Sequence, residues 1–443
     1  MKAQSDLGRF DGNGPILPLL FFTAPVVTSV LPRLTPLFLF LIGLTLVLPS
    51  LRRGQGIGQL LASNSALSAC LVFALYIFIN ASWALDQGAA LSKAALLLGA
   101  ILIVFAGAPI FAGLSGWQIR RTAVAFVAGA LLGALYLMLE LITEAALTRA
   151  FMNAMAILPE RAKHIAVVKG EVKSINLSEF NQNITLLTFH LWPGVLILSA
   201  VKNIPYRTLA IILFTLAFAI PILVSEHDSS IVALFGSILV FFVARFWSRA
   251  TIRALAALWC LGFVLILPLN FLAYNAQLHL AEPLPASHRA RIIIWEYTSE
   301  RTLERPLFGI GMDSTPGMHP DPPLKTAPSQ REKPEGFVFK RTTAHHAHNI
   351  FLQSWYELGL IGAILLATTG VLVVMRIDLL PPRAQPYAAA AFAAFALIAS
   401  FAWGMWQTWF MCAVALLPLY VAIASVTARS PTDSLSDIGS EDR

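Results

Sequence analysis

Twelve apolar runs divide the sequence, each close to the ~20 residues that a helix needs to cross a bilayer. Backbone groups without partners are costly in hydrocarbon, so each run is expected to be a helix. The sequence therefore predicts an all-α, polytopic membrane protein of about twelve transmembrane helices. The runs lie at about 15–31, 34–50, 66–83, 92–112, 122–145, 182–201, 208–225, 229–247, 252–272, 349–375, 384–404 and 406–426.

The composition also favours a membrane environment. Only 12% of the residues are charged and 57% are hydrophobic, whereas soluble domains carry about 25% charged residues. The net charge of +7 could suggest nucleic acid, but the basic residues stand in short clusters between apolar runs, as topology determinants do. Nucleic acid is therefore not an expected partner. Cys70, Cys260 and Cys412 each lie in an apolar run without metal-ligand spacing, so neither a disulfide framework nor a metal is expected.

The distribution of basic residues predicts the topology. If the N-terminus is cytoplasmic, five turns on the cytoplasmic side carry arginine or lysine, while the short turns on the other side carry almost none. This is the positive-inside pattern, and it places both termini in the cytoplasm. The basic residues of the five turns are Arg52, Arg53, Arg120, Arg121, Lys202, Arg207, Arg245, Arg249, Arg253, Arg376 and Arg383.

Two long loops then lie outside the cytoplasm, and both are basic. A basic surface next to the bilayer suits a phosphorylated membrane lipid. We expect helices 1–9 within 1–272, with the first long loop at about 146–181. The second is a large outer loop over 273–347, with an amphipathic helix at 287–305. Helices 10–12 follow within 348–428, and a disordered cytoplasmic tail covers 429–443.

Two motif blocks flank the larger loop. The later block runs from His345 through His348-Asn349 to Gly359 and Gly362, at the mouth of the tenth helix. It resembles the signature of the O-antigen ligase family, which shares its membrane core with O-antigen polymerases. That signature is a His, then Asn, Ser or Gln, nine residues, a Gly, two residues, and a Gly or similar residue. The earlier block resembles a second family pattern, an Arg-x-x-x-Trp helix before a Pro-Leu-x-Gly-x-Gly turn. Its residues are Arg291, Trp295, Arg305, Pro306, Gly309 and Gly311.

The resemblance covers roughly the second half of the chain, and the twelve-helix frame agrees with it. It implies a glycosyltransferase at the periplasmic face of the bacterial inner membrane. The donor would be an undecaprenyl-diphosphate-linked glycan, and the acceptor a sugar hydroxyl of the lipid A-core. No cofactor is expected, and the enzyme is expected to be metal-independent.

The residues of the two blocks suit this reaction. A sugar hydroxyl is a poor nucleophile, and His348 can act as its general base because imidazole has a pKa near ~6.5. The departing diphosphate needs positive charge, which an arginine supplies without losing its proton. We expect Arg291 to be catalytic in this sense and Arg289 to bind the donor. The alternative for Arg291 is an ion pair with Glu296 or Glu300.

Other residues of these blocks are candidates for substrate binding. His346 and Asn349 flank His348 closely, and Trp295 lies one turn after Arg291. The alternatives are that His348 caps the tenth helix, that His346 is a loop or supporting residue, and that Trp295 packs its helix onto the bundle. Zinc binding by the histidines would lack a nearby carboxylate or Cys partner.

One turn departs from the family pattern. Family members usually carry a Ser-Arg pair between the seventh and eighth helices, and that Arg is assigned to the donor diphosphate. Here the turn begins at Ser225 and continues Glu226-His227-Asp228. Ionisable residues at the membrane face are seldom idle, so all three are candidates for substrate binding, with helix capping by Asp228 or Ser229 as the alternative. The spacing of Glu226 and Asp228 also leaves a divalent ion open.

Other functions remain open on the sequence alone. A polymerase of the same superfamily and a protein O-oligosaccharyltransferase share the motifs and differ in the acceptor. From another class, a polysaccharide flippase or transporter is opposed by the lack of a repeat between the two halves of the chain. A non-catalytic partner in polysaccharide export is a further alternative.

Overall fold

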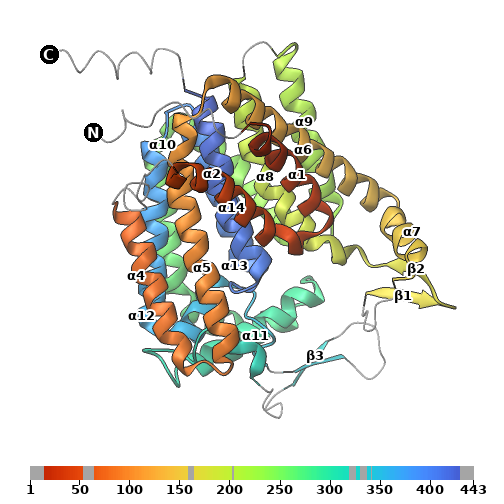
Figure 1. The fold of residues 1–443 in the computed structure, drawn as a ribbon. Helices are drawn as coiled ribbons and strands as arrows, with labels where there is room; N and C mark the ends of the chain where they lie inside the picture. Colours follow the sequence, from red (N-terminus) through yellow and green to blue (C-terminus); the bar gives the residue numbers. More distant parts are fainter. Residues whose placement is uncertain are drawn as a thin grey trace.

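The computed structural model describes residues 14–52, 64–157, 164–201, 204–318, 326–329, 337–340 and 342–429. These residues form a helical bundle, with the short helix α11 at one end of it (Figure 1). Nine of the described helices are long and apolar enough to cross a membrane, which confirms the all-α, polytopic class. The helices are α1 Ile16–Val30, α2 Thr35–Arg52, α4 Ser65–Asn80, α5 Gln87–Gly107, α6 Gly116–Ile142, α7 Ala146–Ala154, α8 Asn181–Ala200, α9 Arg207–Val224, α10 Asp228–Asn275, α11 Ala286–Thr302, α12 Ile350–Met375, α13 Gln385–Phe401 and α14 Thr408–Thr427.

Helix α10 accounts for two of the predicted spans. A straight helix of its 48 residues would be about 72 Å long at 1.5 Å per residue. Both of its ends nevertheless contact α11, which has only 17 residues. Asp228 lies 3.6 Å from His288, and Asn270 donates a hydrogen bond to Ser299. The chain therefore folds back at Trp247, where φ is −131° and ψ is 54°.

Two shorter apolar helices, α1 and α13, complete the apolar set in the described part of the chain. Helix α1 packs against α6 at two glycines. A Cβ on Gly129 would come within 2.1 Å of the Phe22 carbonyl oxygen, and one on Gly133 within 2.4 Å of Ser29 Oγ. Small residues allow such backbones to approach closely, as in other membrane bundles. The nine long helices, α1 and α13 together account for all twelve runs expected from the sequence, because α10 supplies two of them.

The helices differ in how much of their surface faces outward. Helix α8 lies in the interior, where residues Asn183 to Ile197 are buried without interruption. Helix α9 instead exposes large apolar side chains, among them Leu209, Leu213 and Leu216. Such an apolar surface is favourable against lipid and unfavourable against water. Helix α9 is therefore a lipid-facing element at the edge of the bundle.

Two β-hairpins, which the sequence did not predict, lie in the two long loops. Strands β1 (Ile165–Val168) and β2 (Glu171–Ile175) pair antiparallel with Ile165 opposite Ile175. Strands β3 (Thr326–Ser329) and β4 (Phe337–Lys340) pair in the second loop. Figure 1 shows the first hairpin beside α7, and Asn153 of α7 exchanges two hydrogen bonds with the Val172 backbone. Apart from Arg429, the tail predicted to be disordered lies outside the described residues.

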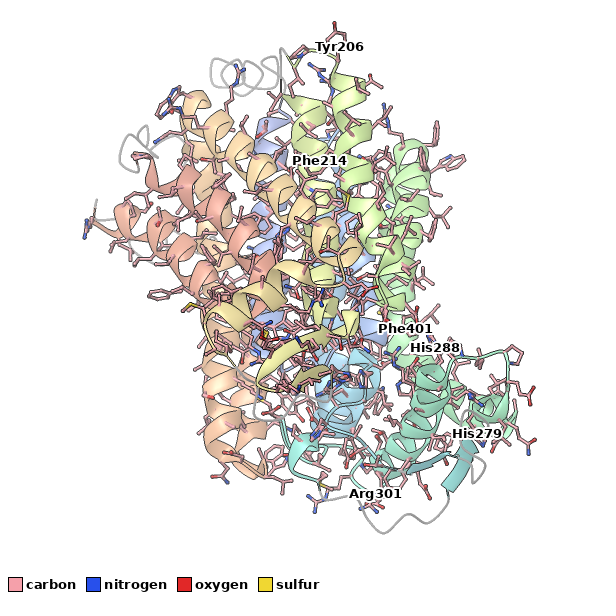
Figure 2. The ribbon with its side chains drawn as sticks, turned by 90° about the vertical axis from the view of Figure 1, so that its right-hand side faces the viewer. Tyr206, Phe214, His279, His288, Arg301 and Phe401 are labelled. Carbon is pink, nitrogen blue, oxygen red and sulfur yellow. The ribbon has the colours of Figure 1, made fainter. Side chains whose placement is uncertain are left out.

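The turns of the bundle separate into two groups, at opposite ends. We call the first the α11 end: it brings together α11, the start of α10 and the end of α13. We call the second the arginine end: it brings together the starts of α6 and α9 and the end of α14. Figure 2 shows the separation, with Tyr206 before α9 at one extreme and His279 and Arg301 at the other. These turns fall into the two groups that the alternating topology predicts, and which end faces the cytoplasm stays a prediction.

Candidate active site

A cavity of about 330 Å³ lies at the α11 end, between α10, α11 and the end of α13. Arg291 and His288 of α11 line it, together with Asp228 at the start of α10. Phe401 and Trp295 contribute aromatic walls. Figure 2 shows His288 and Phe401 side by side at this junction. The cavity therefore combines a guanidinium group with predominantly apolar surroundings.

His348 is not among the described lining residues, but the lining residue Trp295 donates a hydrogen bond to the backbone of its neighbour Ala347. The backbone of His348 has φ of +53°, in the left-handed region that only a few per cent of non-glycine residues adopt. Its Nδ1 lies 2.6 Å from the carbonyl oxygen of Ala402, in the turn between α13 and α14. A strained backbone that is held by its surroundings is found most often at functional sites.

The bond to Ala402 defines the tautomer of His348. A carbonyl oxygen can only accept, so Nδ1 carries the hydrogen and Nε2 of the neutral ring is a free acceptor. The pKa of His348 is lowered to about 4, mainly by burial. The hydrogen bond to Ala402 raises this pKa, and the positive charge of Arg291 lowers it. The ring is therefore neutral near pH 7, with the lone pair of Nε2 available to a proton.

His346 packs against His348, with 4.0 Å between the ring centroids. Its Nε2 lies 3.2 Å from Nε2 of Gln407, and Oε1 of Gln407 accepts a hydrogen bond from Trp409. That second bond orients the amide, so Gln407 donates to His346 and the proton of His346 lies on Nδ1. Burial lowers the pKa of His346 to about 3, with smaller contributions from His348, His345 and Arg291.

The turn between α9 and α10 contributes a third histidine, His227, which is more deeply buried than His346 and His348. His227 is 6% exposed. Its Nδ1 lies 2.7 Å from Ser230 Oγ, and its ring packs on Trp403. Burial, together with a smaller contribution from the charge of Arg291, lowers its pKa to about 3. Glu226 and Asp228, on either side, are exposed. The structure thus places Arg291 within electrostatic range of His227, His346 and His348.

Arg291 itself is partly buried. Burial lowers its pKa, and the negative charge of Asp228 opposes the shift. Arg289 lies two residues earlier on the same helix, and residues at this spacing do not share a helix face. It is 2% exposed and is not among the described lining residues. The two arginines are therefore not equivalent, and donor binding by Arg289 stays a prediction.

Trp295 and Asn349 both support the loop that carries His348. Trp295 Nε1 donates a 2.7 Å hydrogen bond to the carbonyl oxygen of Ala347. Asn349 is the N-cap of α12, and its Oδ1 accepts from the Leu352 backbone N–H at 3.0 Å. Trp295 also lines the cavity, so it can both hold the loop and contact a ligand. Substrate contact by Asn349 stays a prediction.

The glycines of the two motif blocks interlock. Gly309 and Gly359 have φ of +69° and +68°. A Cβ on Gly309 would lie 2.4 Å from the Glu357 carbonyl, and one on Gly359 2.4 Å from the Leu307 carbonyl. The helical geometry of α12 breaks at Gly359, and the freed backbone pairs with the other block through Ile310 N to Tyr356 O, Gly311 N to Glu357 O, Leu360 N to Pro306 O and Ile361 N to Leu307 O. Both blocks therefore build one backbone junction.

A buried carboxylate completes this junction. Glu357 accepts hydrogen bonds from the Thr315 hydroxyl and backbone, from the Asp313 backbone and from Gln353. It also accepts one from the indole of Trp406, in the turn between α13 and α14. One side chain thus connects α12 to the loop after α11 and to the turn that holds His348. Sequence reasoning missed Glu357, although an ionisable residue within an apolar run is a signal of its importance.

His288, Gln407 and Ala402 were also missed from the sequence.

No cluster of three or more His, Cys, Asp or Glu side chains that could hold a metal ion occurs among the described residues. Metal independence stays a prediction. The residues that the structure does bring together are Arg291, His227, His346, His348 and Asp228.

The fold and this cluster define a polytopic membrane protein with a buried polar site at one end of its bundle. The family model for the O-Antigen ligase matches residues 211–367, from α9 into α12, and includes both motif blocks. This match to residues 211–367 confirms the resemblance drawn from the motifs. That family implies a membrane enzyme of the glycosyltransferase type acting on glycan and lipid. No curated protein matches the chain.

Proposed function

We propose that the protein transfers an undecaprenyl-diphosphate-linked glycan onto a sugar hydroxyl of the lipid A-core, at the periplasmic face of the bacterial inner membrane. The observation that carries this proposal is the imidazole of His348. Its Nδ1 is bonded to the Ala402 carbonyl, which leaves Nε2 as a proton acceptor, and Arg291 lines the adjacent cavity. A base beside a cation is what this transfer requires.

The chemistry follows from these two groups. The acceptor oxygen forms a bond to the anomeric carbon of the donor, and the bond from that carbon to the diphosphate oxygen breaks. The electron pair leaves with the diphosphate, whose negative charge Arg291 binds. The proton of the hydroxyl passes to Nε2 of His348 and then to water. Because a diphosphate is a weak base, it needs no general acid.

The low pKa of His348 also fits an anionic donor. A base with a pKa of about 4 accepts protons poorly, but burial and the Arg291 charge set this value in the free protein. A bound diphosphate brings negative charge, which offsets the charge of Arg291, stabilises the imidazolium and raises its pKa. The base would therefore become stronger only when donor is present, which limits its reaction with other proton donors.

Arg291 can also replace the arginine that is missing from the turn between α9 and α10. The family resemblance expects Ser-Arg there, whereas this chain has Ser225, Glu226 and His227. Arg291 lies within electrostatic range of His227 and Asp228 in that turn. A guanidinium group reaching this place from α11 would supply the same charge to the diphosphate.

A deletion strain tests the proposal. Loss of a ligase leaves long glycan chains on the carrier lipid and none on lipid A, and wild-type protein should restore the lipopolysaccharide ladder. His348→Asn should not restore it, because Asn has no basic nitrogen. The structure should be kept, since the Asn amide can still donate to Ala402 O and Asn tolerates positive φ. Removing a general base costs on the order of 10² to 10⁴ in rate. His345→Asn, an exposed neighbour, is the matched control and should restore the ladder.

The lipid-linked pool separates the rival functions. A polymerase deletion leaves single repeat units on the carrier, and a flippase deletion leaves units trapped on the cytoplasmic side. Normal complementation by His348→Asn, at membrane abundance equal to wild type, would contradict the assignment of the base. Loss of transfer to a protein acceptor, with a normal lipopolysaccharide ladder, would favour a protein O-oligosaccharyltransferase.

A further inference from the structure

A second and larger cavity lies at the arginine end of the bundle. Its volume is about 680 Å³, within the range of ~300 to 1,000 Å³ typical of sites for small ligands. Four arginines from four separate segments line it: Arg120 of α6, Arg207 of α9, Arg383 before α13 and Arg429 after α14. The positive-inside pattern predicts that this end is cytoplasmic.

The charge of this cavity is of one sign. All four arginines are exposed, and none of them takes part in an ion pair between described residues. Asp378, the described carboxylate in the turn between α12 and α13, lies near Arg249 instead. Like charges around one hollow repel each other, and an anion that binds between them relieves this repulsion. The positive-inside rule explains basic turns, but it does not require four of them to share a cavity.

Most of the remaining lining is apolar, apart from Ser199 and Thr427. Ile119, Leu196 and Val426 lie in the cavity wall. Helix α9, which supplies Arg207, exposes apolar side chains such as Leu209 and Leu213 along its length. A ligand with a phosphate and acyl chains could therefore place the phosphate among the arginines and its chains against α9. Free phosphate would use only the first of these features.

We propose that this cavity binds the phosphate headgroup of an anionic phospholipid from the cytoplasmic leaflet. Arginine suits this ligand because its planar fork makes paired hydrogen bonds to phosphate oxygens. Basic pockets between transmembrane helices bind phosphate-rich lipid headgroups in the same way. The site lies at the opposite end from His348 and Arg291, so the proposal does not depend on the proposed function.

Lipid titration of the purified full-length chain tests this inference. Cardiolipin, phosphatidylglycerol and phosphatidylcholine would each be added to protein in detergent, with binding followed by native mass spectrometry and by the melting temperature. We expect saturable binding of the two anionic lipids and none of phosphatidylcholine. The variant R120Q/R207Q/R383Q should weaken that binding at least tenfold, and higher salt should weaken it in the wild type.

The matched control removes the same charge from the same end. In R121Q/R245Q/R253Q, three exposed arginines outside the cavity are replaced, and lipid binding should change less than twofold. Equal losses in the two variants would overturn the site, because the lipid would then respond to net charge alone. Displacement of cardiolipin by millimolar inorganic phosphate or glycerol phosphate would overturn the lipid as the ligand.

The acidic tail is the rival occupant from the chain itself. Residues 430–443 contain Asp433, Asp437, Glu441 and Asp442, directly after the cavity residue Arg429. Replacement of these four acids by their amides should leave lipid binding within twofold of wild type. A gain of tenfold or more would mean that the tail fills the cavity, and this would overturn the proposal.

Discussion

The two ends of the bundle both place arginine around a cavity, but in opposite surroundings. At the α11 end, Arg291 is partly buried and lies among His227, His346 and His348, with Asp228 of opposite charge nearby. At the arginine end, four guanidinium groups are exposed and of one sign. Burial shifts the pKa values of side chains and selects their tautomers, and acid–base catalysis depends on both. Exposed arginines contribute only charge and shape, which are sufficient to recognise a lipid headgroup.

The largest effect should come from a charge-conserving change at the buried end. Arg291→Lys keeps the positive charge but loses the planar fork that binds two diphosphate oxygens. We expect kcat/KM for glycan transfer to fall on the order of 10²-fold, measured with purified enzyme and lipid-linked donor. Arg253→Lys, an exposed arginine of the other end, should change it less than twofold.

Arg289→Lys tests whether the two arginines of α11 differ. Its position away from the cavity lining predicts a smaller loss of kcat/KM than that of Arg291→Lys, at equal abundance in the membrane. A greater loss for Arg289→Lys, seen mainly as a raised KM for donor, would transfer the diphosphate contact to Arg289. Arg289 would then replace Arg291 as the buried arginine in the comparison between the two ends of the bundle.

A smaller effect on activity, but a clear one on stability, is expected at Gly359. Alanine there would take a φ of +68° and place its Cβ 2.4 Å from the Leu307 carbonyl. Gly359→Ala should therefore lower the free energy of unfolding by on the order of 3 kcal/mol, seen as a reduced melting temperature in detergent. At Gly116, in the arginine end, a Cβ would meet nothing within 4 Å, so Gly116→Ala should leave the melting temperature unchanged or raise it. Equal effects would mean that the junction of the two motif blocks is not under steric constraint.

Much of the fold follows from the sequence because lipid imposes a simple rule. Each of the twelve apolar runs corresponds to a helix or to one arm of α10, since hydrocarbon leaves the backbone no other way to satisfy its hydrogen bonds. The β1–β2 and β3–β4 hairpins lie in the long loops, outside the spans, where that rule does not apply. The break of α12 at Gly359 was also not predicted. It depends on pairing with Pro306 and Leu307, far away in the sequence.

The candidate site was only partly predictable for a related reason. His348, His346 and Arg291 stand in recognisable blocks, and the structure brings them together. The bond that defines the His348 tautomer comes from the backbone of Ala402, and no side-chain pattern can identify a carbonyl group. The separation of Arg289 from Arg291 does follow from helical spacing, because residues two apart point to different sides.

The pH dependence of kcat/KM tests the central claim most directly, because this constant reports the ionisation of the free enzyme. Since burial lowers the pKa of His348 to about 4, the basic form persists as the pH falls. Our account predicts a constant kcat/KM from pH 7.5 down to about pH 5. The fall of kcat on the acid side should begin at a higher pH than that of kcat/KM, because bound diphosphate raises the pKa of His348. A kcat/KM already halved near pH ~6.5, the value of an unperturbed imidazole, and falling about tenfold per pH unit below it, would contradict the account.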